Sequence, residues 1–381
     1  MFSTPRIFLV LICSLTLLSI LGFQTGTPAP ATLDEQIGQM IMVGFRGLSL
    51  APDNPIVSDI RDRKIGSVIL FDYDVPAKSP VRNIESPDQV RQLVRSLQDL
   101  AHTPLLIAID QEGGRVNRLK EKFGFPPTVS AQHLGTLNDP NLTRRQSEQT
   151  AKTLADLGIS LNFAPVVDLN TNPENPVIGK LERSFSADPN IVTRHARAWI
   201  EGHHQHNVLC ALKHFPGHGS SRADSHLGFV DVTETWTKAE LEPYRQLIKA
   251  DQVDVVMTAH IFNSKLDSKV PATLSRPVIT GVLRGELGYQ GVVVSDDMQM
   301  KAISAHYGLE TAIQQAINAG VDILVFGNNA LWDPEIAQKA ISIIKQSVKD
   351  GKISRNRIEE SYERILKLKK QKSGVRSQKS E

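Results

Sequence analysis

The sequence contains little cysteine and almost no net charge. Only Cys13 and Cys210 occur among its 381 residues, and neither belongs to a C-x-x-C pair, so a disulfide scaffold is excluded and zinc-type cysteine spacing is absent. Lys and Arg number 43 against 41 Asp and Glu, a net charge of +2, which gives no field for general nucleic-acid binding. The hydrophobic content of 40% supports a large core and excludes global disorder.

Several cofactor and metal motifs are also missing. No G-x-G-x-x-G follows the first predicted strand, and Gly113-Gly114 lacks the spacing of a phosphate loop. No H-E-x-x-H occurs, and the first predicted strand has no H-x-H. A metal hydrolase, which a chelator would inhibit, therefore remains only as an alternative, with four possible ligands: His214, His218, His226 and His260. Three further histidines are expected to lie exposed at a helix end without a functional role: His203, His204 and His206.

The two ends of the chain differ from its body. Arg6 precedes an apolar run over residues 7–23, and a Thr-, Pro- and Ala-rich stretch follows, which predicts a signal peptide and linker over residues 1–31. An uncleaved membrane anchor, a buried helix and a lipid attached at Cys13 are the alternatives. We therefore expect an exported protein that is periplasmic, held in the cell envelope or secreted. Residues 371–381 are predicted to form a basic disordered tail.

The body repeats one pattern between residues 40 and 330. Short β-branched runs, several of them continuous and apolar as in parallel strands covered on both faces, occupy residues 41–45, 67–72, 105–110, 162–169, 208–214, 253–260, 291–296 and 321–327. Helical patterns separate them: one begins after the N-cap residue Ser86, another at Pro277, and a third ends at Gly320. This order predicts an α/β protein with a single (β/α)8 TIM-type barrel over residues 32–370, with a doubly wound open sheet as the alternative.

Polar residues collect where the predicted strands end. Active sites of such barrels lie at the C-terminal ends of strands and in the loops after them. A single Asp or Asn there could cap a helix, but seven strand ends favour a functional site. The residues are Asp72, Asp110, Asp168, Lys213 with His214, His260, Asp296 and Asn328.

Three clusters could carry chemistry. Lys213 and His214 end a strand, and in the Gly- and Ser-rich loop that follows, Asp224 could orient and charge the imidazole of His226 as a general acid/base. In the second cluster, Asp296 could be a nucleophile or a metal ligand, whereas Asp297 is the better candidate for capping the helix near residue 302. The third cluster, residues 110–118, begins at Asp110 and could hold sugar hydroxyls close to its glycines.

Together these stretches resemble the bacterial β-N-acetylhexosaminidases of glycoside hydrolase family 3. The resemblance covers roughly residues 33–370. It is carried by Lys213-His214-Phe215-Pro216-Gly217-His218-Gly219, Asp224-Ser225-His226, Ser295-Asp296-Asp297-Met298, Asp110-Gln111-Glu112-Gly113-Gly114-Arg115-Val116, Glu182-Arg183-Ser184-Phe185 and Met257-Thr258-Ala259-His260. One departure is Ser220-Ser221, where the family often has an acidic residue and Thr.

The resemblance implies specific roles. Asp296 would be the nucleophile that forms a covalent glycosyl-enzyme, His226 the general acid/base and Asp224 its partner. The terminal N-acetylglucosamine would be bound by Asp110, Arg118, Arg183, Lys213 and His214. The resemblance implies no metal and no organic cofactor. Since the chain ends near the close of the barrel, we expect the acid/base to come from a barrel loop rather than from a second domain.

The expected reaction is hydrolysis of terminal β-linked N-acetylglucosamine by a retaining, exo-acting enzyme. Cell-wall fragments and chitin-type oligosaccharides are both candidate substrates. The alternatives are a family 3 β-glucosidase, an N-acetylglucosaminide phosphorylase and, from another class, a non-catalytic sugar-binding protein of the envelope. We expect a monomer that binds no nucleic acid and touches a membrane only through its N-terminal segment.

Overall fold

The computed structural model describes residues 1–2 and 31–372. The chain divides into two units between Ala31 and Thr32. The predicted signal peptide or anchor lies, apart from its two ends, outside the described residues, as do residues 373–381 of the predicted tail. None of the helices within residues 31–372 has both the length and the hydrophobicity needed to cross a lipid bilayer.

Eight parallel strands form the main sheet, and each overlaps a run predicted from the sequence, although β4 shares only Asn162 with the run predicted over residues 162–169. Their order in the sheet is β10 (Leu324–Phe326), β1 (Ile41–Gly44), β2 (Ser67–Leu70), β3 (Leu106–Ile109), β4 (Leu161–Asn162), β5 (Leu209–Phe215), β7 (Val255–Thr258) and β9 (Val292–Val294). Strands β6 (Val230–Asp231) and β8 (Ile261–Phe262) pair separately. This pair is not predicted by the sequence, because two-residue strands leave no periodic pattern.

The ends of the strand order meet between β9 and β10. Val294 forms a parallel bridge with Ile323, and Ser295 N donates to Ile323 O at 2.9 Å. Side chains strengthen this seam, since Ser295 Oγ accepts from Val325 N at 2.9 Å and Asp322 Oδ2 accepts from Val293 N at 3.0 Å. The sheet is therefore a closed (β/α)8 barrel, which confirms the predicted fold and excludes the open doubly wound sheet.

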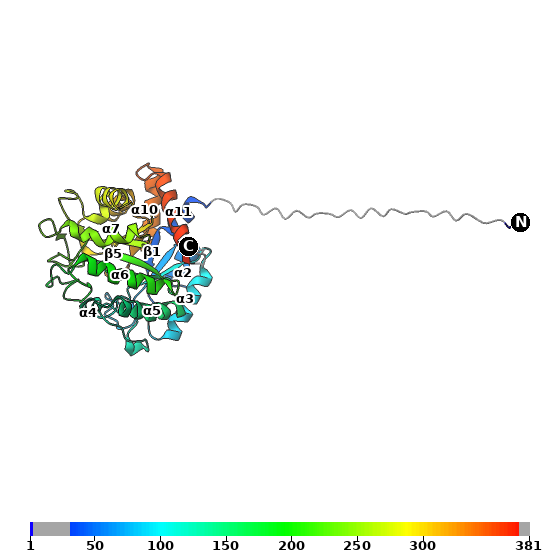
Figure 1. Ribbon diagram of the computed structural model, residues 1–381. Helices are drawn as coiled ribbons and strands as arrows, with labels where there is room; N and C mark the ends of the chain where they lie inside the picture. The colour runs from blue at the N-terminus through cyan, green and yellow to red at the C-terminus, as the bar shows by residue number, and fades with distance from the viewer. Residues whose placement is uncertain (3–30, 373–381) are drawn as a thin grey trace. The chain divides into compact units, whose positions relative to one another are not determined.

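Helices cover the outside of the barrel (Figure 1). They are α1 (Leu33–Gln39), α2 (Pro55–Arg61), α3 (Pro87–Leu100), α4 (Ala131–Leu137), α5 (Pro140–Asp156), α6 (Pro189–His204), α7 (Glu242–Lys249), α8 (Lys301–Ser304), α9 (Leu309–Ala319), α10 (Ile336–Lys349) and α11 (Arg355–Lys372). Shorter turns are the 3₁₀-helices η1 (Glu121–Phe123), η2 (Lys238–Leu241) and η3 (Ala272–Leu274). The helix predicted to begin at Pro277 is the π-helix η4 (Pro277–Glu286).

Local sequence explains where these helices begin and end. Ser86 Oγ accepts from Gln89 N at 3.2 Å, as predicted for the start of α3, and α9 ends at Gly320, whose φ of +123° suits glycine. Helix α11 continues two residues into the segment expected to be a disordered tail. The helix boundaries thus follow from capping residues that lie next to them in the sequence.

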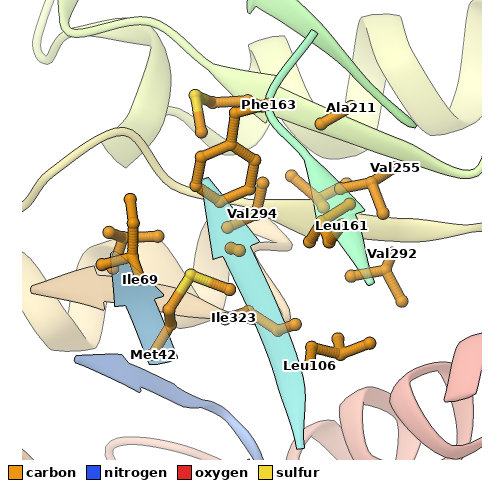
Figure 2. Packing of buried hydrophobic residues seen from close by; sticks show 14 of the residues in the cluster. Met42, Ile69, Leu106, Leu161, Phe163, Ala211, Val255, Val292, Val294 and Ile323 are labelled. Carbon is orange, nitrogen blue, oxygen red and sulfur yellow. The ribbon is translucent and has the colours of Figure 1, made fainter. Parts of the chain in front are cut away.

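The strand side chains form one continuous core. Every residue of β1, β2, β3 and β9 is buried, as expected for strands covered on both faces. Figure 2 shows side chains from successive strands packed together, among them Met42, Ile69, Leu106, Phe163 and Val294. This packed interior is a rigid support for the loops at its carboxyl end.

Helix α11 is fastened to the barrel at the β9–β10 seam. The fully buried carboxylate of Asp322 pairs with Arg357 and Arg364 of α11, at 3.0 and 3.2 Å. It also pairs with Arg284 of η4 at 2.8 Å, and Ser361 Oγ of α11 donates to it at 2.8 Å. The same carboxylate that accepts a hydrogen bond from β9 thus binds the C-terminal helix.

The expectation that His203 lies exposed is wrong. Its side chain is fully buried, with Nδ1 2.7 Å from Ser147 Oγ on α5 and Nε2 3.0 Å from Asn162 Nδ2 on β4. Burial lowers the pKa of His203 to about 3. His204 bonds Asp254 at 2.7 Å. The sequence pattern predicted where α6 ends, but it could not predict that α5 packs against His203.

Candidate active site

Charged side chains at the carboxyl ends of β3 and β5 meet at Lys213. Its Nζ lies 2.7 Å from Asp110 Oδ1 and 2.7 Å from Glu112 Oε1, and the side chain is only 1% exposed. A buried ammonium group is stable only when it is paired in this way. Lys213 therefore ties two polar residues after β3 to the end of β5.

Glu112 also binds Arg183, which lies in the segment between β4 and α6. Arg183 donates from Nε to Glu112 Oε2 at 2.8 Å and from Nη2 to Oε1 at 2.7 Å. Burial alone would raise the pKa of Glu112, but the charges of Arg183 and Lys213 outweigh it and hold that pKa well below its usual range. Arg183 Nη2 is also 3.2 Å from His214 Nε2, so the cluster extends to the end of β5.

His214 is oriented by a buried aspartate that follows β4. Its Nδ1 lies 2.7 Å from Asp168 Oδ2, and its backbone N–H donates to Asp168 Oδ1 at 3.1 Å. The backbone N–H of His218 donates to the same oxygen at 2.7 Å. Asp168 thus fixes both the ring of His214 and the start of the loop that leads to His226.

Arg118 stands beside this cluster but is held loosely. Its guanidinium lies 3.7 Å from Asp110 and 3.8 Å from Asp72, beyond hydrogen-bond distance. Its backbone is fixed more firmly, since Gln111 Oε1 accepts from Arg118 N and Leu119 N at 3.0 Å each. The guanidinium therefore retains donors for a substrate.

Asp296 follows β9 and is the carboxylate best suited to nucleophilic attack. Its Oδ1 accepts from Asp297 N at 2.8 Å. Burial would raise the pKa of Asp296, but His260, His214 and His226 outweigh burial and lower that pKa to about 2. Asp296 is consequently ionised throughout the neutral and mildly acidic range.

The capping role expected for Asp297 is wrong. Its Oδ1 accepts from Gln299 N and Gly327 N at 3.0 Å each, and Met300, which precedes α8, has no side-chain cap. Burial raises the pKa of Asp297 to about 6. Asp297 ties the loop after β9 to the end of β10, a contact that helix patterning cannot reveal.

His226 and Asp224 form the pair expected from their spacing. His226 Nδ1 lies 2.8 Å from Asp224 Oδ1, and the backbone N–H of His226 donates to the same oxygen at 2.8 Å. Desolvation opposes the imidazolium, but Asp224 and Asp296 outweigh it and raise the pKa of His226. Its side chain is 60% exposed, as a proton donor that exchanges with water requires.

Close backbone packing determines the path of the loop that carries His226. A Cβ atom on Gly219 would collide with the carbonyl oxygen of Leu169, so only glycine fits there. Further along the loop, Ser225 O accepts from Ala302 N at 3.3 Å, which places it against α8. The loop therefore begins beside β4 and reaches the segment that follows Asp296.

Five of the eight site residues predicted from the sequence lie in one network of ion pairs and hydrogen bonds: Asp110, Arg118, Arg183, Lys213 and His214. Asp296 and the Asp224–His226 pair interact electrostatically with this network. The roles of all eight stay predictions. Asp168 was noted at a strand end without a role, and Glu112 was not singled out. The signal for Glu112 was its place two residues after Asp110. Its partner Arg183 is 71 residues away, so no local pattern could reveal the pairing.

Removing the charge of Glu112 is expected to destabilise the fold. Glu112→Gln would remove the buried negative charge that Arg183 and Lys213 share. Because breaking a buried ion pair is costly, this change should lower the free energy of unfolding by about 3–5 kcal/mol. Urea titration measures this change. The exposed pair Lys180–Glu174, at 3.0 Å, supplies the control, because Glu174→Gln should change little. Equal stabilities of the two variants would contradict the structural role of Glu112.

The four histidines considered as metal ligands are bonded to protein groups. Besides the partners of His214 and His226, His260 lies 2.8 Å from Thr273 Oγ1 and 2.9 Å from Asp297 O, and His218 lies 3.3 Å from Ser225 Oγ. Within the part of the chain that the structure describes, no three His, Cys, Asp or Glu side chains are grouped so that they could hold a metal ion.

The chain is similar to proteins of one known family. A family model described as the glycosyl hydrolase family 3 N terminal domain matches residues 32–368. Beta-hexosaminidase A of Pseudoalteromonas piscicida is 35% identical over 91% of this chain and 62% of its own length. The beta-hexosaminidase of Tolumonas auensis is 39% identical over 76% of this chain and 83% of its own.

Solved structures give the same grouping. A glycoside hydrolase family 3 β-N-acetylglucosaminidase from Paenibacillus has a TM-score of 0.83 and 38% identity, over 90% of this chain and 63% of its own. A β-N-acetylhexosaminidase from Beutenbergia cavernae has a TM-score of 0.80 and 28% identity, over 90% and 99%. This chain spans less than two thirds of the Pseudoalteromonas and Paenibacillus proteins. With the barrel and the family model both covering its body, the chain belongs to glycosyl hydrolase family 3.

Proposed function

We propose that this protein is a retaining, exo-acting β-N-acetylhexosaminidase that releases terminal β-linked N-acetylglucosamine. The observation that carries the proposal is that ionised Asp296 interacts electrostatically with His226, which is itself paired with Asp224. A carboxylate and a separate proton donor are what a retaining glycosidase needs. Relatives named β-hexosaminidase support the choice of sugar.

The reaction takes place in two steps. Asp296 attacks the anomeric carbon and forms a C–O bond to the sugar, while the bond to the leaving oxygen breaks and protonated His226 gives that oxygen its proton. Neutral His226 then takes a proton from water, whose oxygen attacks the anomeric carbon and releases Asp296 as a carboxylate. Two displacements at the same carbon retain its configuration. Asp224 keeps the imidazole oriented and stabilises its charged form.

The charged cluster would hold the terminal sugar. Hydroxyl and amide groups of a sugar need both donors and acceptors, and the cluster supplies them from Asp110, Arg118, Arg183, Lys213 and His214. We propose cell-wall fragments or chitin-type oligosaccharides as substrates, an exported location and a monomeric state. The N-terminal composition supports export.

The test compares three reactions of the soluble body from about residue 32 onward. We expect turnover of 4-nitrophenyl N-acetyl-β-D-glucosaminide, little turnover of the matching glucoside, and a rate that does not depend on phosphate. Preference for the glucoside would indicate a β-glucosidase, and formation of a sugar 1-phosphate would indicate a phosphorylase. Binding of N-acetylglucosamine by a folded but inactive protein would favour the non-catalytic alternative.

A further inference from the structure

One arc of the barrel contributes none of the side chains proposed to bind or react with the terminal sugar. Strands β10, β1 and β2 lie between β9, which presents Asp296, and β3, which presents Asp110. The side chains proposed to act on the terminal sugar come from β5 and from the segments after β3, β4, β5 and β9. The loops after β10, β1 and β2 nevertheless lie at the same end of the barrel as Asp296.

These loops carry an unusual group of exposed apolar side chains. Tyr73 and Val75, after β2, are 41% and 53% exposed, and Leu331, after β10, is 59% exposed. Next to Leu331, Trp332 is half-buried. We call these four residues the apolar rim. Exposed aromatic and aliphatic groups gathered beside an active site are typical of a surface that binds a ligand.

Two arginines and Asp74 hold the loops of the apolar rim in place. The Arg46 guanidinium lies 4.1 Å from the centre of the Trp332 ring and donates to both oxygens of Asp74, at 2.6 and 2.9 Å. Arg82, which is buried, donates to Asp74 Oδ2 at 2.9 Å, to Phe45 O at 3.0 Å and to the carbonyl of Asn328 at 2.9 Å. One arginine thus joins the three loops, so the rim is preorganised.

Hydrogen bonds connect the apolar rim to the segment after the proposed nucleophile. Gln299, three residues beyond Asp296, accepts from Asn328 N at 2.7 Å and donates to Leu331 O at 3.3 Å. Asn329 joins the two sides, donating to Tyr73 O and accepting from Val75 N at 3.0 Å each. The rim is therefore structurally continuous with the loop that carries Asp296.

We infer that the apolar rim binds the saccharide on the leaving-group side of the scissile bond. This inference rests on the proposed function. The terminal sugar is matched by the charged cluster, whereas the rim offers the apolar surface on which the C–H face of a pyranose ring packs. His226 must face the leaving oxygen, and its loop contacts α8, which lies between Asp296 and β10 in the chain. Residues 299–302 thus contact both the His226 loop, at Ser225 O, and the apolar rim, at Leu331 O, and for this reason we assign the leaving saccharide to the rim.

The test uses two substrates that differ in their leaving groups. Tyr73→Ala and Leu331→Ala should each lower kcat/KM for chitotriose by about 10-fold, mainly through KM, and change it less than about 2-fold for 4-nitrophenyl N-acetyl-β-D-glucosaminide. Leu137→Ala is the matched control, because Leu137 is 52% exposed on α4 and lies outside the rim. It should leave both values unchanged.

The outcomes separate this inference from the proposed function. If the parent enzyme cleaves both substrates and the rim variants retain the parental ratio of kcat/KM values, the inference is overturned while the function stands. Equal losses on both substrates would also overturn it, since they would show that the rim contacts the terminal sugar or only stabilises the fold. A parent enzyme inactive on both substrates would remove the proposed function and this inference with it.

Discussion

Replacing Asp296 with Ala is expected to lower turnover of 4-nitrophenyl N-acetyl-β-D-glucosaminide by about 10⁴-fold or more. The variant lacks the atom proposed to attack the anomeric carbon, and the neighbouring carboxylate of Asp297 is held toward the end of β10 by hydrogen bonds from Gln299 N and Gly327 N. Steady-state kinetics measure the loss. Circular dichroism and binding of N-acetylglucosamine confirm that the variant is folded.

Azide makes this test more specific. A small anion can occupy the space left by the Asp296 side chain and attack the anomeric carbon from the same face. The C–N bond then forms as the bond to 4-nitrophenolate breaks, and a single inversion gives the α-glycosyl azide. Recovery of activity with that product would support the assigned nucleophile. Near-parental turnover of Asp296→Ala without azide would remove the assignment.

The second large effect is expected for His226→Ala, and it should depend on the leaving group. A sugar alkoxide leaves only when it is protonated, so chitobiose hydrolysis should fall by about 10²- to 10⁴-fold. Nitrophenolate needs little protonation, so aryl glycosides should lose less than about 10-fold in the first step. Equal losses on both kinds of substrate would count against an acid role for His226.

The dependence on pH follows from the same two residues. The pKa of Asp296 is lowered to about 2, so loss of its charge should not reduce activity until the pH approaches that value. His226 must be protonated to act as an acid, and its raised pKa keeps the proton to a higher pH than a free imidazole would. Chitobiose hydrolysis should therefore decline on the alkaline side as His226 loses its proton, and that decline should be absent in His226→Ala.

Asp224→Asn provides the matched control for the pH profile. The amide removes the charge that favours the His226 imidazolium but retains a side chain of the same size. The alkaline decline should therefore move to lower pH while activity at acidic pH is largely kept. A profile identical to that of the parent would show that another group sets the alkaline limb.

The sequence predicted the features that are encoded locally. The eight strands appear as short apolar runs, and Asp110, Lys213 and Asp296 could be placed because each ends such a run. Contacts between segments that are distant in the sequence could not be predicted. The pairing of Glu112 with Arg183 and the burial of His203 against α5 depend on how loops and helices meet in the fold, which no periodicity records.

The apolar rim illustrates the same limit. Tyr73, Val75 and Leu331 look like ordinary loop residues in the sequence, and the rim exists only because β10 and β2 both neighbour β1. Arg82 joins these distant segments, because it donates to the carbonyl of Phe45, 37 residues before it, and to that of Asn328, 246 residues after it. Only the closed barrel makes these residues neighbours.

The seam between β9 and β10 has a consequence for synthesis on the ribosome. A nascent chain that has emerged as far as residue 290 contains every barrel strand except these two, and it lacks Asp296. Even when β10 has emerged, the buried carboxylate of Asp322 must wait for Arg357 and Arg364, which arrive with the C-terminal helix. The proposed nucleophilic site is therefore fully supported only after residue 364 has emerged from the ribosome.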